Sequence, residues 1–97
     1  MEILRNGGSA VDAMVAAAAA IAVHYPHMNS LGGDGFWLIQ REGEAPVAID
    51  AAGRAAAAID PQSAPPSRGA GAAFTSAGTV AGWQVARDYI GQFTEVQ

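Results

Sequence analysis

An alanine-rich run that ends at a proline and leads into a cluster of glycines limits most strongly how this chain can fold. Within residues 7–36, GGSAVDAMVAAAAAIAVHYPHMNSLGGDGF, Ser9 and Asp12 have the three-residue spacing of a helix capping box. An acid in the first turn also suits the positive end of the helix dipole. We therefore expect a helix over residues 10–24, which Pro26 prevents from continuing.

The expected helix has almost no polar side chain after Asp12. A helix that is apolar all round is normally buried on several sides, and a surface of alanine lets neighbouring elements approach closely. The sequence therefore predicts a buried helix wedged between a sheet and other helices.

The same apolar run does not predict a membrane segment. Residues 13–23 are too short for a membrane span, which takes roughly 20 residues. A secretory signal would need a basic start, and no sustained positive charge precedes this run. We expect no membrane partner; any signal peptide would lie before Met1, so the sequence leaves the cellular compartment unknown.

The segments that flank this helix predict a short helix and two short strands. Residues 1–5 (MEILR) have the character of the last turn of a helix, which the following Asn-Gly-Gly would end. Residues 36–40 (FWLIQ) and 46–50 (PVAID) predict two strands of a β-hairpin, joined through the turn of residues 41–44. The expected fold class is thus α+β.

The last third of the chain predicts a loop and then a helix. Residues 51–71 are rich in Ala, Pro, Ser and Gly, with a short helical turn expected over residues 55–59. A helix is expected over residues 79–91, capped by Thr79 or Ser76 and stopped at Gly91. Its apolar face is expected to comprise Val80, Trp83, Val85, Ala86 and Ile90.

Composition excludes several classes of function. The five basic residues are all arginines and are scattered, and the net charge is −4, so no basic stripe is present for nucleic acid. The chain has no cysteine, hence no disulfide and no thiolate metal site. Much of the 51% hydrophobic content is alanine, which buries little apolar surface. We therefore expect the 97 residues to be a piece of a larger domain.

Two patterns invite a ligand-binding interpretation, and neither is favoured. The glycine cluster of residues 32–35 could form an anion-binding nest. However, a phosphate loop follows a strand and opens a helix, whereas this cluster precedes a strand, so a tight buried turn is expected. His24 and His27 are separated by a proline and do not share a helix face, so they predict no metal site. Trp37 and Trp83 are expected to be core anchors, and no cofactor is indicated.

Three blocks in a fixed order resemble the large subunit of the gamma-glutamyltranspeptidase family, within the N-terminal nucleophile (Ntn) hydrolases. The first covers residues 3–39 and matches the family's helix end, capped alanine-rich helix, proline and glycine cluster. The second, AIDAAGRAAAAI (residues 48–59), is similar to the segment that carries Gly-Arg-Ala-Pro or Phe-Arg-Glu. The third, TSAGTVAGWQVARDYIG (residues 75–91), is similar to the Val-Pro-Gly-Thr-Val-Ala-Gly-Trp segment.

The resemblance implies a fragment of a four-layer αββα sandwich from an enzyme that cleaves itself into a large and a small subunit. In this family the cleavage frees an N-terminal threonine, whose hydroxyl attacks an amide carbonyl while the α-amine takes the proton. The acyl group then passes to water or to an amino acid acceptor. This threonine belongs to the small subunit, so we expect no catalytic residue among residues 1–97. Thr75, Thr79 and Thr94 lie in the wrong blocks for that role.

The resemblance also singles out Arg54 for substrate binding. In the Phe-Arg-Glu version of the second block, an arginine binds the substrate α-carboxylate, and a guanidinium can pair bidentately with a carboxylate. Here Ala52 stands at that arginine's place and Arg54 lies two residues later. Arg54 can reach the same ligand, bind another, or form a surface ion pair. The displacement favours acylase-like or amidohydrolase-like members over strict gamma-glutamyl specificity.

The sequence thus predicts part of a gamma-glutamyltransferase- or hydrolase-like enzyme that acts on a small-molecule amide. Its expected partners are the remainder of the large subunit and the autoprocessed small subunit. The alternatives are an acylase-like amide hydrolase without glutamyl preference, and a truncated remnant without activity. A downstream strand led by threonine would distinguish the enzyme from the remnant, and a chain that ended at Gln97 would favour the remnant.

Overall fold

The computed structural model describes residues 1–60, 62–72 and 75–93. In these residues the fold class is α+β, as predicted, with one pair of antiparallel strands and several helices. No helix among them combines the length and the hydropathy needed to cross a membrane. The elements along the chain are α1 (Glu2–Arg5), α2 (Ala10–His24), β1 (Gly35–Ile39), β2 (Val47–Ala51), the 3-10 helix η1 (Ala70–Ala72) and α3 (Thr79–Gly91).

The beginning of α2 confirms the predicted capping box. The Ser9 hydroxyl accepts a hydrogen bond from the Asp12 N–H at 3.0 Å, and the Asp12 carboxylate accepts one from the Ser9 N–H at 3.2 Å. These bonds satisfy backbone donors that the first helical turn would otherwise leave free. The turn between α1 and α2 also follows the prediction, because Gly7 adopts a φ of +83°, which glycine tolerates best.

The two strands form the predicted hairpin, displaced slightly from the expected bounds. Trp37 pairs with Ile49 and Ile39 with Val47. The connecting turn closes where the Glu44 N–H donates to the Arg41 carbonyl at 3.1 Å. The strands were expected over residues 36–40 and 46–50, but β1 begins and β2 ends where Gly35 pairs with Ala51.

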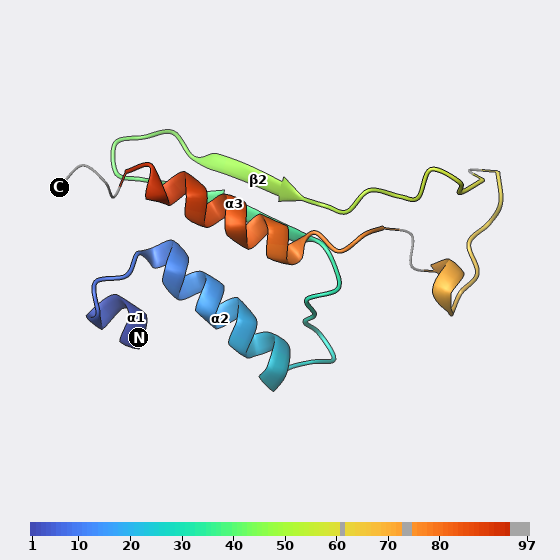
Figure 1. Ribbon diagram of the computed structural model, residues 1–97, viewed down its shortest axis with the longest axis horizontal. Coiled ribbons are helices and arrows are strands. Elements are labelled where there is room, and N and C mark those ends of the chain that lie inside the picture. The colour runs from blue at the N-terminus through green and yellow to red at the C-terminus, as the bar shows by residue number, and fades with distance from the viewer. Residues whose placement is uncertain (61, 73–74, 94–97) are drawn as a thin grey trace.

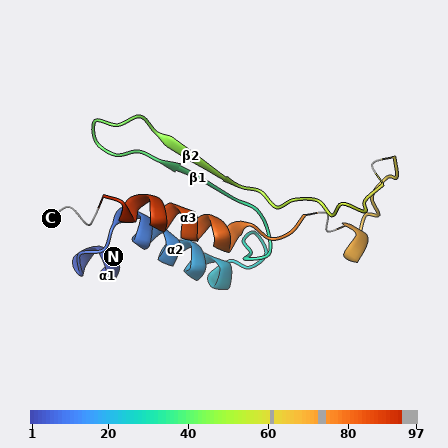
Figure 2. The ribbon, with the colours of Figure 1, turned by 45° about the horizontal axis from the view of Figure 1, so that its top comes forward.

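Helix α3 is the centre of the arrangement. Figures 1 and 2 show the hairpin along one side of α3 and α2 along another, with α1 beside the start of α2. Residues 56–60 and 62–72, which include η1, extend away from these elements. A small core forms where α2, β1 and α3 meet. It consists of the buried side chains of Val11, Ile39 and Ala86, with Trp37, Ile49, Tyr89 and Ile90 packed around them.

The prediction that α2 is buried on several sides is wrong for this chain. Val11 is the one buried residue along α2, and the side chains of Met14, Ile21 and Val23 are exposed. The physical reason is that, within the described residues, α2 packs against α1 and α3 and meets β1 only at the small core around Val11, so its remaining sides are uncovered.

The predicted helical turn over residues 55–59 is present only in part. Ala55 forms an isolated antiparallel bridge with Thr75, and a single turn follows in which the Ile59 N–H donates to the Ala56 carbonyl. Pairing with a distant segment thus overrides the helical preference of the alanines. The sequence did not predict η1.

Helix α3 has the predicted bounds but a different cap and a different buried face. Its N-cap is Gly78, and the Thr79 side chain makes no capping bond. The buried residues of α3 are Thr79, Gly82 and Ala86, whereas Val80 and Val85 are exposed. Small residues occupy this face because the hairpin lies close against it, where a Cβ on Gly82 would lie 2.6 Å from the Ala51 Cβ.

Candidate functional site

Arg54, the predicted substrate-binding residue, lies three positions after the end of β2. It is exposed, and its guanidinium makes no hydrogen bond or ion pair with any residue that the structure describes. The surface ion pair, one of the alternatives for Arg54, is therefore absent from the described part of the chain. The side chain is free to meet a ligand.

The backbone around Arg54 is held from two sides. The Asp34 carboxylate accepts a hydrogen bond from the Gly53 N–H at 2.9 Å. The Arg54 carbonyl accepts one from the Ser76 N–H at 3.1 Å. We call the meeting place of residues 33–35, 51–54 and 76–79 the three-segment junction. It brings together one piece from each of the three sequence blocks.

Thr79 anchors the glycine cluster to the start of α3. Its side chain is buried, and the hydroxyl donates to the Gly33 carbonyl at 2.7 Å and to the Asp34 carbonyl at 3.1 Å. The Gly33 carbonyl also accepts the N–H groups of Gly78 and Thr79, each at 3.0 Å. This buried hydroxyl is fully used in structure, as buried polar groups normally are. The glycine cluster thus forms a bend that Thr79 holds in place, and the expectation of a tight buried turn is met only in part, because Gly32 and Asp34 are exposed.

Two glycines allow the chain segments of the three-segment junction to cross closely. A Cβ on Gly53 would lie 1.5 Å from the Ser76 carbonyl oxygen, and one on Gly78 would lie 2.0 Å from the Ala51 carbonyl oxygen. Both contacts are with backbone atoms, which cannot rotate away. Only glycine fits at these two positions, so the path of the chain before Arg54 depends on them.

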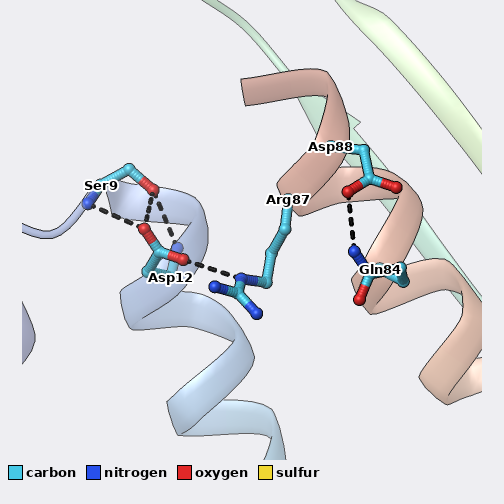
Figure 3. Close-up of polar contacts among 5 residues, drawn as sticks. All are labelled: Ser9, Asp12, Gln84, Arg87 and Asp88. Carbon is cyan, nitrogen blue, oxygen red and sulfur yellow. Dashed lines mark hydrogen bonds and ion pairs between the residues drawn. The ribbon is translucent and has the colours of Figure 1, made fainter. Parts of the chain in front are cut away.

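A second polar cluster lies between the α1–α2 turn and α3. Figure 3 shows the Arg87 side chain reaching from α3 to α2, where its Nε lies 3.0 Å from an oxygen of Asp12. The hydroxyl and then the N–H of Ser9 donate to the Asp12 carboxyl and hold its pKa below the usual value of 3.8, with a smaller contribution from Arg87. Both side chains border an open cleft of about 620 Å³, which does not include Arg54.

Sequence reasoning missed the contact between Arg87 and Asp12. Arg87 joins α2 to α3 across 75 positions of the chain. No local spacing links the two residues, so no sequence signal was available for this pair. The partner of Asp34 was missed for the same reason, since Gly53 lies 19 positions away.

The other residues considered for a ligand site do not form one. His24 and His27 are both exposed, and the ring of His27 lies against that of Tyr25. Within the described ranges, no group of three or more His, Cys, Asp or Glu side chains is placed to hold a metal ion. Trp37 packs against the core, as predicted, and Thr94 lies outside the described residues.

Comparisons with known proteins find relatives that match nearly the whole chain. The chain is 55% identical over 101 aligned positions to the oxamate amidohydrolase proenzyme of Klebsiella pneumoniae, covering 95% of this chain and 19% of that protein. It is 42% identical to the glutathione hydrolase-like YwrD proenzyme of Bacillus subtilis, covering 90% of this chain and 18% of that protein. It is 38% identical to the glutathione hydrolase proenzyme of Escherichia coli, covering 94% of this chain and 17% of that protein.

The chain thus spans about a fifth of the length of these relatives. The family model described as gamma-glutamyltranspeptidase matches residues 1–95, which is nearly the whole chain. The matched region includes all of the three-segment junction. On this evidence, the chain belongs to the gamma-glutamyltranspeptidase family.

Proposed function

We propose that these 97 residues are an N-terminal part of the large subunit of an amide-hydrolysing enzyme. The family membership and the proenzyme names of three relatives support this proposal. In the complete protein, α2, α3 and the hairpin contribute to an αββα sandwich. The remainder of the large subunit and an autoprocessed small subunit are the partners that complete it.

The proposed chemistry is acyl transfer through a threonine outside this chain. The threonine hydroxyl attacks the amide carbonyl carbon, and the threonine α-amine takes the hydroxyl proton. The C–N bond then breaks, and the amine leaves with that proton. Water attacks the resulting ester, which releases the acid and restores the threonine. Residues 1–97 alone are inert in this scheme, and Thr79 supports that expectation because its hydroxyl already donates to two carbonyls.

The observation that carries a substrate-binding role is the exposed guanidinium of Arg54, which has no partner among the described residues and stands on a backbone held at both sides. A guanidinium binds a carboxylate through two parallel hydrogen bonds. We therefore propose that Arg54 binds the carboxylate of a small substrate that also carries the amide to be cleaved. Oxamate has both groups in one small molecule, and glutathione has them as well.

The position of Arg54 favours a small amide over a gamma-glutamyl compound. Arg54 lies two residues beyond the place where the resemblance puts a glutamyl-binding arginine, which Ala52 occupies. The 55% identity to an oxamate amidohydrolase proenzyme, against 38% to a glutathione hydrolase proenzyme, points in the same direction. We propose hydrolysis of a small carboxylate-bearing amide, without glutamyl preference.

The test is an assay of the full-length protein that contains this chain. Gel electrophoresis reports whether it cleaves itself into two subunits. Ammonia release from oxamate is then compared with glutamate release from glutathione, and both are repeated with glycylglycine as an acyl acceptor. We expect self-cleavage and faster ammonia release. Faster glutamate release would replace this substrate class with gamma-glutamyl compounds, and the absence of both cleavage and activity would support a non-catalytic remnant.

A further inference from the structure

We infer that Asp34 is a positioning residue for Arg54: its carboxylate holds the backbone that carries the guanidinium. This inference rests on the proposed function of Arg54 in substrate binding. Asp34 need not touch the substrate in this arrangement. It acts through the Gly53 N–H, which lies 2.9 Å from its carboxylate oxygen.

Asp34 is itself held in place by its neighbours. Its carbonyl accepts a hydrogen bond from the buried Thr79 hydroxyl at 3.1 Å. The next residue, Gly35, begins β1 and pairs with Ala51 at the end of β2. The carboxylate therefore leaves a backbone that both α3 and the hairpin anchor. It can dictate the direction that the chain takes after β2.

The other restraints on the chain that leaves β2 are the close crossing of Gly53 with Ser76 and the bridge between Ala55 and Thr75. The Ala52 N–H donates to the carboxylate of Asp50, its own near neighbour, at 2.9 Å. That bond shapes the local turn but ties it to nothing else. The Gly53 bond to Asp34 and the Arg54 bond to Ser76 connect this turn to other segments. The residue before Arg54 is Gly53, and a glycine backbone has more accessible φ and ψ angles than any other. Loss of the Asp34 bond therefore lets Gly53 change conformation and move Arg54.

A double-mutant cycle in the full-length protein tests this inference. Asp34→Ala is expected to raise KM for the proposed substrate about fivefold, the usual worth of one such hydrogen bond, and to leave kcat unchanged. Asp34→Asn keeps an oxygen acceptor and should restore the wild-type KM. In an Arg54→Ala background, Asp34→Ala should cause no further change, because the side chain it positions is gone.

The matched control is Asp60→Ala. Asp60 is exposed and accepts a backbone N–H, from Gln62, at the same distance of 2.9 Å, but this bond stays within its own loop. Asp60→Ala should leave KM unchanged. Hydrogen–deuterium exchange measured on peptides that contain Gly53 reports on the Gly53 N–H directly and does not depend on enzyme activity. Exchange at Gly53 should accelerate in Asp34→Ala and not in Asp34→Asn.

Several outcomes would overturn the inference. An equal rise of KM from Asp34→Ala with and without Arg54 would mean that Asp34 does not act through Arg54. A loss of kcat and thermal stability that Asp34→Asn fails to rescue would indicate a general structural role. If Arg54→Ala itself leaves KM unchanged while exchange at Gly53 still depends on Asp34, the proposed function of Arg54 fails and the bond positions something else.

Discussion

At the scale of single residues, Arg54 combines a fixed backbone with a free side chain. Its carbonyl is bonded to Ser76 and the preceding N–H to Asp34, while the guanidinium has no partner among the described residues. A guanidinium on a fixed backbone has fewer positions to sample, so it loses less entropy when it binds an anion than a guanidinium on a mobile backbone does. This arrangement suits recognition of a carboxylate better than it suits a surface ion pair.

We predict that Arg54→Ala in the full-length protein raises KM for a carboxylate-bearing amide by about 10- to 100-fold, because a charge-assisted pair is lost. Arg54→Lys should recover only part of the affinity, since an ammonium group cannot form the two parallel bonds. Steady-state kinetics on oxamate measures both effects. Arg68→Ala, which removes another exposed arginine, is the control and should leave KM unchanged. An equal effect of the two alanine substitutions would contradict a specific role for Arg54.

At the scale of elements, a local sequence pattern sets where α2 begins, and a contact with a distant residue helps to set where it lies. The capping box between Ser9 and Asp12 begins the helix. The same Asp12 carboxylate then binds Arg87 of α3, so a single side chain both caps α2 and connects it to α3 (Figure 3). The Asp12–Arg87 pair is exposed to solvent, so we expect the capping bonds to contribute more than the ion pair does.

This capping box predicts a pH-dependent contribution to stability. The pKa of Asp12 is lowered in the folded protein, chiefly by the Ser9 hydroxyl, so its contribution is present above pH 3.8 and is lost as the pH falls through the lowered pKa. Asp12→Ala should therefore reduce the melting temperature of the full-length protein at pH 7. The difference from wild type should begin to shrink as the pH falls below 3.8.

Thermal melts at several pH values check this prediction. Ser9→Ala should cost about 1 kcal/mol at neutral pH, as the loss of an N-cap usually does. Asp88→Ala is the control, because Asp88 is an exposed carboxylate that bonds only Gln84 of its own helix among the described residues. A difference between wild type and Asp12→Ala that stays constant down to pH 3 would contradict the assignment.

At the scale of the whole molecule, the described residues form a thin arrangement with little interior. No large side chain among them is fully buried, and the core of Val11, Ile39 and Ala86 is small. On the outer face of β1, Phe36 and Leu38 are 70% and 75% exposed. So much uncovered apolar surface leaves little hydrophobic stabilisation to offset the entropy of ordering the chain.

We predict that the 97-residue chain alone has no cooperative thermal transition. Its helices lack the packing that stabilises short helices in water. Circular dichroism at 222 nm during heating measures this, with the full-length protein as the comparison. A sharp transition of the isolated chain would show that these residues form an independent domain.

The amino-acid sequence by itself determined the local elements and the family. The bounds of α2 and α3, the capping box, the hairpin turn and the glycine stop after α1 depend on residues within a few positions of one another, and all were predicted. Three blocks in a fixed order sufficed to indicate the family, which the comparison over residues 1–95 confirmed. Arg54 as a candidate came from that resemblance.

Only the tertiary structure decided which residues meet. Thr79 was one of two residues expected to cap α3, but its hydroxyl donates to Gly33, 46 positions away. Asp34 holds Gly53, and Arg87 reaches Asp12. Burial was also decided by the tertiary structure, since α2 has the sequence of a buried helix but lies largely uncovered. Contacts and burial depend on the path of the whole chain and on which elements are present to pack, and neither leaves a periodic or short-range pattern in the sequence.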